Sequence, residues 1–176
     1  MSRNKKTEFV VTGALIAAAY AGLTYLSNVL GLAYGPIQLR VSEVLTILPM
    51  FTPASIPGLT IGCFIANIGS FNAADMIFGT FATLVAALLT YFLRDIKFKG
   101  IPFLAMLPPV IVNAVVIGFE IACFFLPSGY SLWGFIISGI QVGLGELIVC
   151  YLFGTPFYMV VKKYRIFEKG FLKNKH

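Results

Sequence analysis

The stretch that decides the fold of this chain is Gln38-Leu39-Arg40-Val41-Ser42-Glu43, because it is a polar break between two long apolar runs. Residues 9–32 before it and residues 44–74 after it carry no charged side chain. A helix of roughly 20 apolar residues crosses the hydrocarbon core of a bilayer. Polar groups are costly near hydrocarbon, so an amide, a guanidinium, a hydroxyl and a carboxylate at this place indicate a functional site.

The composition of the whole chain excludes a soluble domain. Of its 176 residues, 59% are hydrophobic and 11% are charged, and the mean hydropathy is +0.90. A soluble domain of this length cannot bury so much apolar surface, because small domains have a high ratio of surface to volume. We therefore predict an integral membrane protein with a single domain over residues 1–176. The first apolar run is too long for a signal peptide, so we interpret it as a retained span.

The net charge of +6 does not indicate a nucleic-acid partner, since the basic residues flank apolar runs. Basic residues prefer the cytoplasmic side of a membrane. The run over 44–74 contains three prolines, so it is either one broken span or two short ones. Only two short spans place both termini and every Lys and Arg except Arg40 on the cytoplasmic side. We therefore predict an all-α protein with six membrane spans, at about 9–32, 41–51, 57–70, 75–93, 101–126 and 131–161.

The span over 41–51 is short. Eleven residues of α-helix are about 16 Å long, so this segment crosses hydrocarbon only if it is tilted or buried against its neighbours. Irregular backbone is tolerated at this depth where it lines a cavity.

Polar side chains gather in the outer half of the predicted bundle. Glu43 and Asp75 begin their helices there, and Glu120 lies two turns outward of Asn113 on the same helical face. Four carboxylates accompany Arg40 alone, which gives a pocket a formal charge of −3 if all ionise. An Arg40–Glu43 pair with only a structural role is an alternative. The candidate ligand-binding residues are Gln38, Arg40, Glu43, Asp75, Asn113, Glu120, Trp133, Gln141 and Glu146, although Trp133 also suits an interfacial aromatic belt.

Sequence motifs for catalysis or metal binding are absent. The chain has no GxxxxGK[ST], HExxH or GxSxG, and its one histidine is His176. The cysteines lie within apolar runs without CxxC spacing, which is typical of small buried hydrophobic residues. We therefore predict that the chain is not an enzyme and uses no cofactor or metal.

Small residues at a spacing of four mark two lines on the first span. One line is Ala14, Ala18 and Gly22, and the other is Gly13, Ala17 and Ala21. Such spacing lets helix backbones approach closely. It serves either packing inside the chain or docking of another membrane protein.

The string over 38–43, followed by Leu45-Thr46 and Leu48-Pro49, resembles the hallmark of the QueT family. The resemblance covers nearly the whole chain in length, spans and basic tail. These proteins are substrate-binding S components of energy-coupling-factor (ECF) transporters. The resemblance implies a multi-pass protein of a bacterial plasma membrane that binds queuine or a 7-deazaguanine such as preQ1 or preQ0. It also implies docking on a transmembrane coupling protein and two ATPase subunits, through Ala14, Ala17, Ala18 and Ala21.

The predicted pocket suits such a ligand. A 7-deazaguanine has two adjacent N–H donors that match one carboxylate, for which Glu43 and Glu120 are candidates. Its carbonyl oxygen requires a donor, and its flat ring an aromatic face. Three alternatives stay open: an S component for another vitamin, a stand-alone carrier coupled to protons through Glu120 or Glu146, and a membrane scaffold.

Overall fold

The computed structural model describes residues 3–33, 39–69, 72–127 and 129–167, and within them every regular element is a helix. An isolated β-bridge joins Phe98 and Ile101. The prediction of an all-α fold is confirmed. In chain order the helices are α1 (Arg3–Val29), η1 (Val41–Met50), α2 (Ser55–Ile68), α3 (Ala73–Leu93), η2 (Phe103–Met106), α4 (Leu107–Phe124), α5 (Leu132–Leu147), η3 (Ile148–Phe153) and α6 (Gly154–Tyr164).

Four helical stretches are long and apolar enough to cross a membrane. They are Asn4–Val29, Ala73–Leu93, Phe103–Phe124 and Leu132–Tyr164. The last one joins α5 and α6 through η3, a π-helical segment that we did not predict. Two shorter apolar helices, Val41–Met50 and Ser55–Ile68, lie close to the short spans expected at 41–51 and 57–70. The count of six spans and the placement of the termini stay predictions.

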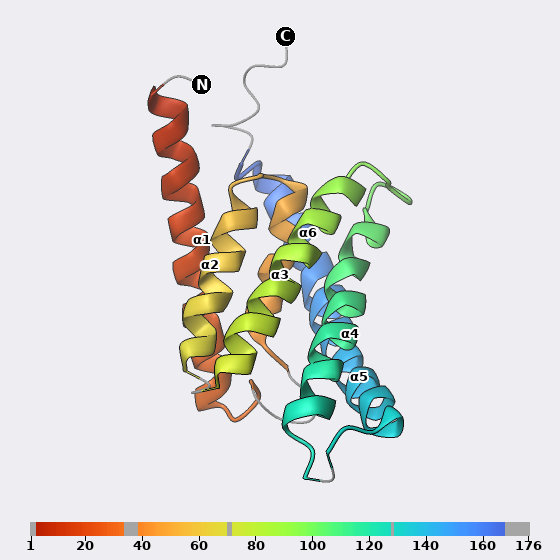
Figure 1. The fold of residues 1–176 in the computed structure, drawn as a ribbon. Helices are drawn as coiled ribbons and strands as arrows, with labels where there is room; N and C mark the ends of the chain where they lie inside the picture. The colour runs from red at the N-terminus through yellow and green to blue at the C-terminus, as the bar shows by residue number, and fades with distance from the viewer. Residues whose placement is uncertain (1–2, 34–38, 70–71, 128, 168–176) are drawn as a thin grey trace.

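Apart from Arg40, the basic residues that the structure describes gather at one end of the bundle, which we call the basic end. Figure 1 shows the start of α1, the connection between α3 and η2, and the end of α6 at this same end. The connection carries Lys97 and Lys99, and the last turn of α6 carries Lys162 and Lys163. The start of η1, with Arg40 as its N-cap residue, lies away from this end, beside Thr24 and Ser27 in the last turns of α1. This distribution matches the charge pattern that led us to predict both termini on one side.

The central element is η1, which contacts α1, α2, α3 and α6 as well as η2 and η3. It is a 3-10 helix of 10 residues, whereas such helices rarely exceed one turn. A 3-10 helix rises about 2 Å per residue, so η1 is about 20 Å long, longer than the α-helix we assumed. Residues three apart share a face in this geometry, which aligns Arg40, Glu43 and Thr46.

Glycines bring α1 and α2 into close contact. A Cβ atom added at Gly58 would lie 2.7 Å from the carbonyl oxygen of Gly13, and one added at Gly62 would lie 2.8 Å from that of Ala17. The line formed by Gly13, Ala17 and Ala21 is buried here. Packing inside the chain, one of our two interpretations of the small residues, therefore holds for this line.

Candidate ligand-binding site

Glu43 lies at the centre of a buried polar cluster. It is the third residue of η1, its side chain is 3% exposed, and the Tyr20 hydroxyl on α1 donates a hydrogen bond to its Oε1. Its Oε2 is buried and has no hydrogen-bond partner among the described residues. A buried polar atom without a partner is costly, so Oε2 is available to a ligand donor.

Hydroxyl groups hold the start of η1 against α1. Thr24 Oγ1 lies 2.7 Å from Ser42 Oγ and 3.0 Å from the carbonyl oxygen of Tyr20. The backbone N–H of Val41 donates to Ser27 Oγ at 3.0 Å. The Thr24–Ser42 and Val41–Ser27 bonds tie the two residues just before Glu43 to α1.

Glu146 on α5 is the second buried carboxylate, and its oxygens have partners. Asn113 on α4 donates to its Oε1 at 2.6 Å, and Cys150 Sγ lies 3.6 Å from its Oε2. The same sulfur lies 3.7 Å from Thr46 Oγ1, whose hydroxyl donates to the carbonyl oxygen of Glu43 at 2.6 Å. Through Cys150 and Thr46, Glu146 is thus linked to the backbone of Glu43, in a network that connects η1, α4, α5 and η3.

Arg40 is buried as well, with 8% of its surface exposed. Its Nε donates to the carbonyl oxygen of Ala33 at 3.1 Å, and its Nη1 donates to Asn67 Oδ1 at 3.3 Å. Asn67 in turn donates to the backbone oxygen of Asp75 at 2.8 Å. The guanidinium therefore links the start of η1 to α2 and α3 inside the bundle.

Glu120 near the end of α4 is the third buried carboxylate and differs from the other two. Its side chain is 0% exposed, and neither of its oxygens has a hydrogen-bond partner among the described residues. Asp75 acts on it through a side-chain interaction as well as through its charge, and the charge of Arg40 acts on it too. Glu120 thus lies beside a carboxyl and a guanidinium, and no donor is bonded to its oxygens among the described residues.

The remaining predicted site residues lie in different surroundings. Trp133 is 75% exposed on the first turn of α5, as an interfacial aromatic residue would be. Gln141 is partly exposed on the same helix, and Asp75 is partly buried in the first turn of α3. Gln38 lies outside the described residues. The structure therefore gathers Arg40, Glu43, Asn113, Glu120 and Glu146 inside the bundle, while their role in binding stays a prediction.

Sequence reasoning missed several members of the cluster, of which Tyr20 is the most important. Tyr20, Thr24 and Ser27 stand at a spacing of four and three, so their hydroxyls share one face of α1. That pattern was a readable signal. We read these residues as part of an apolar span because their hydroxyls are surrounded by alanine and leucine.

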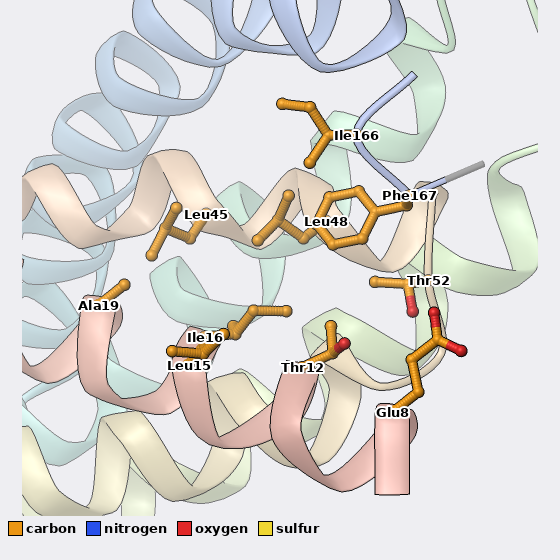
Figure 2. Close-up of a pocket in the computed structure, with 10 residues that line it drawn as sticks. All are labelled: Glu8, Thr12, Leu15, Ile16, Ala19, Leu45, Leu48, Thr52, Ile166 and Phe167. Atoms are coloured by element: carbon orange, nitrogen blue, oxygen red, sulfur yellow. The ribbon is translucent and has the colours of Figure 1, made fainter. Parts of the chain in front are cut away.

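A cavity of about 330 Å³ lies between α1, η1 and the chain after α6, on the basic-end side of the cluster (Figure 2). Leu15, Ile16 and Leu48 give it apolar walls, and Glu8 lies at one end with Thr12 and Thr52. It contains none of the predicted ligand-binding residues. Its lining residues are Glu8, Thr12, Leu15, Ile16, Ala19, Leu45, Leu48, Thr52, Ile166 and Phe167.

Comparison with known proteins gives two matches. Residues 10–163 match the family described as QueT transporter. A stretch of 97 residues is 42% identical to the queuosine precursor transporter QueT of Lactococcus lactis subsp. cremoris (strain MG1363). That stretch is 55% of this chain and spans 57% of the length of the relative. No solved structure matches the chain.

Proposed function

Because this chain belongs to the QueT transporter family, as residues 38–49 had suggested, we propose that it is the substrate-binding subunit for uptake of a queuosine precursor. The observation that carries this proposal is the set of three free carboxylate oxygens inside the bundle, two on Glu120 and one on Glu43. A buried acceptor without a partner is costly to leave unpaired, so a ligand that donates hydrogen bonds would bind there with strong selectivity.

The chemistry of a 7-deazaguanine fits these atoms. Its two adjacent N–H donors pair with both oxygens of one carboxylate, and only Glu120 among the three buried glutamates has both oxygens free. Arg40 would donate to the ring carbonyl oxygen. The cationic amine of queuine or of an aminomethyl precursor would pair with Oε2 of Glu43.

Docking on an ECF module is the second part of the proposal. Ala14 and Ala18 are exposed on α1, and a Cβ added at Gly22 would meet nothing within 4 Å. This line of small residues would let a helix of the coupling protein approach closely. Ala17 and Ala21 are buried against α2, so within this proposal they would support the docking helix from inside. The cavity of Figure 2 also lies along α1 and would receive an apolar side chain of the partner.

Equilibrium binding to the purified protein tests the substrate. Queuine or its aminomethyl precursor should bind with a Kd below about 10 μM. Riboflavin and thiamine are the controls, and equal affinity for them, or no binding of the 7-deazaguanines, would reject the proposed substrate class.

A stand-alone carrier coupled to protons is a second candidate, because a buried free carboxylate such as Glu120 also suits a proton relay. Uptake into liposomes that contain this protein alone, driven by a pH gradient, would favour it. The binding-subunit proposal expects uptake only after the ATPase module is added.

A further inference from the structure

We propose that Tyr20 is a positioning residue, which aims the free oxygen of Glu43 at the ligand. This inference rests on the proposed binding function. Tyr20 belongs to α1 and Glu43 to η1, and they are 23 residues apart in the chain. The binding function was argued from groups on η1, α3 and α4, whereas Tyr20 brings α1 into the site.

The hydroxyl of Tyr20 is held in a fixed place. The side chain is 0% exposed and its ring packs in a core with Ile16, Leu45 and Leu59. Gly62 on α2 leaves the necessary room, because a Cβ added there would lie 2.9 Å from the Cβ of Tyr20. The packed ring therefore fixes the position of the phenol oxygen.

The hydrogen bond decides which oxygen of Glu43 is free. Oε1 accepts from Tyr20, and Oε2 has no hydrogen-bond partner among the described residues. The terminal torsion of a glutamate is broad and roughly two-fold, so a carboxylate without this bond would have no single orientation. Binding would then carry the cost of ordering it.

Tyr25 provides a matched control. It lies on the same helix and its hydroxyl also donates a hydrogen bond, to the carbonyl oxygen of Ile65 on α2 at 2.9 Å. Tyr25→Phe and Tyr20→Phe each remove one hydroxyl and one hydrogen bond from α1. Only Tyr20→Phe changes a carboxylate of the cluster.

The test measures Kd for queuine by titration calorimetry on the wild type, Tyr20→Phe, Tyr25→Phe, Glu43→Leu and Tyr20→Phe/Glu43→Leu. We expect Tyr20→Phe to weaken binding at least about tenfold, which is the scale of a lost hydrogen bond to a charged group. Tyr25→Phe should stay within about twofold of the wild type, because it leaves Glu43 untouched. Once Glu43 is leucine, removal of the Tyr20 hydroxyl should cause no further loss, because there is no carboxylate left to aim.

Tyr20→Phe binding as tightly as the wild type would overturn this inference and leave the proposed function standing. The same holds if Tyr20→Phe weakens binding equally in the presence and absence of Glu43, because the hydroxyl would then act independently of the carboxylate. A wild type that binds no queuine would reject the proposed function itself and this inference with it. If Tyr20→Phe alone does not fold, the double variant carries the test, since apolar replacement of both partners leaves no unpaired group. It is expected to fold and to bind like Glu43→Leu, and weaker binding than Glu43→Leu would overturn the inference.

Discussion

Asn113 on α4 donates a hydrogen bond of 2.6 Å to Glu146 on α5. Because of this bond, the three buried glutamates differ in how many of their carboxylate oxygens lack a hydrogen-bond partner among the described residues. The Oε1 atom of Glu146 is engaged by the amide and its Oε2 lies beside Cys150. Glu43 has one free oxygen, and Glu120 has two. In the proposed site, Glu146 therefore stabilises the framework, whereas Glu120 would bind the ligand.

Replacement of Glu120 by glutamine should weaken queuine binding about tenfold to a hundredfold, because one of the two acceptors becomes an NH₂ donor that faces the N–H groups of the ligand. The protein should unfold at the same temperature as the wild type or higher, since a neutral amide costs less to bury without partners than a carboxylate. Calorimetric Kd and thermal unfolding measure the two effects. Glu146→Gln is the control and should affect binding less, and a larger effect from Glu146→Gln would reverse the ranking.

Replacement of Asn113 by alanine should destabilise the protein by about 1–3 kcal/mol, because Glu146 Oε1 then loses its donor in a buried place. Unfolding in a detergent of fixed composition measures this loss. Asn113→Ala combined with Glu146→Leu should recover part of the stability, since no acceptor is left unpaired. Equal stability of Asn113→Ala and the wild type would show that the bond contributes nothing.

Replacement of Gly62 by alanine should separate α1 from α2. The new Cβ would lie 2.8 Å from the carbonyl oxygen of Ala17 and 2.9 Å from the Cβ of Tyr20. These distances are too short, so the backbone of α1 or α2 would have to shift, which costs stability. We expect a loss of about 1–3 kcal/mol in thermal or denaturant unfolding. Gly22→Ala on α1 is the matched control, because nothing lies within 4 Å of the added atom. It should keep or raise the stability, and equal losses from both variants would contradict the close packing at Gly62.

Docking can be tested on the exposed line of α1. Replacement of Ala18 by tryptophan should prevent co-purification with the coupling protein and the two ATPase subunits, because a bulky side chain blocks close approach of a helix. Queuine binding should persist, since Ala18 lies outside the polar cluster. Leu152→Trp on η3 is the control, because Leu152 is also exposed on the surface of the chain. Full assembly of the Ala18→Trp variant would place the docking surface elsewhere.

Much of the architecture follows from one-dimensional patterns. The apolar runs predicted an all-α chain with helices near the observed bounds, and residues 41–51 were expected to form a short element beside a cavity or other helices. That η1 is a 3-10 helix could not be predicted, because its geometry is set by the six elements around it and not by local propensity. The π-helical η3 has the same kind of cause.

The sequence indicated the buried carboxylates of the candidate site better than its uncharged members. Glu43, Glu120 and Glu146 stood out because ionised groups are rare inside spans, and all three are buried. Tyr20 was missed since a tyrosine among alanines reads as an apolar residue, although its hydroxyl completes the cluster. Trp133 was expected either to face the pocket or to lie in an interfacial belt, and its 75% exposure fits the belt.

A structure of the protein with queuine bound would show which carboxylate pairs with the ring. We expect two ring N–H groups to lie about 2.7–3.1 Å from the two oxygens of Glu120, with the amine of the ligand beside Oε2 of Glu43. Queuine bound in the cavity of Figure 2, or bound in the cluster with Glu120 still without a partner, would contradict it.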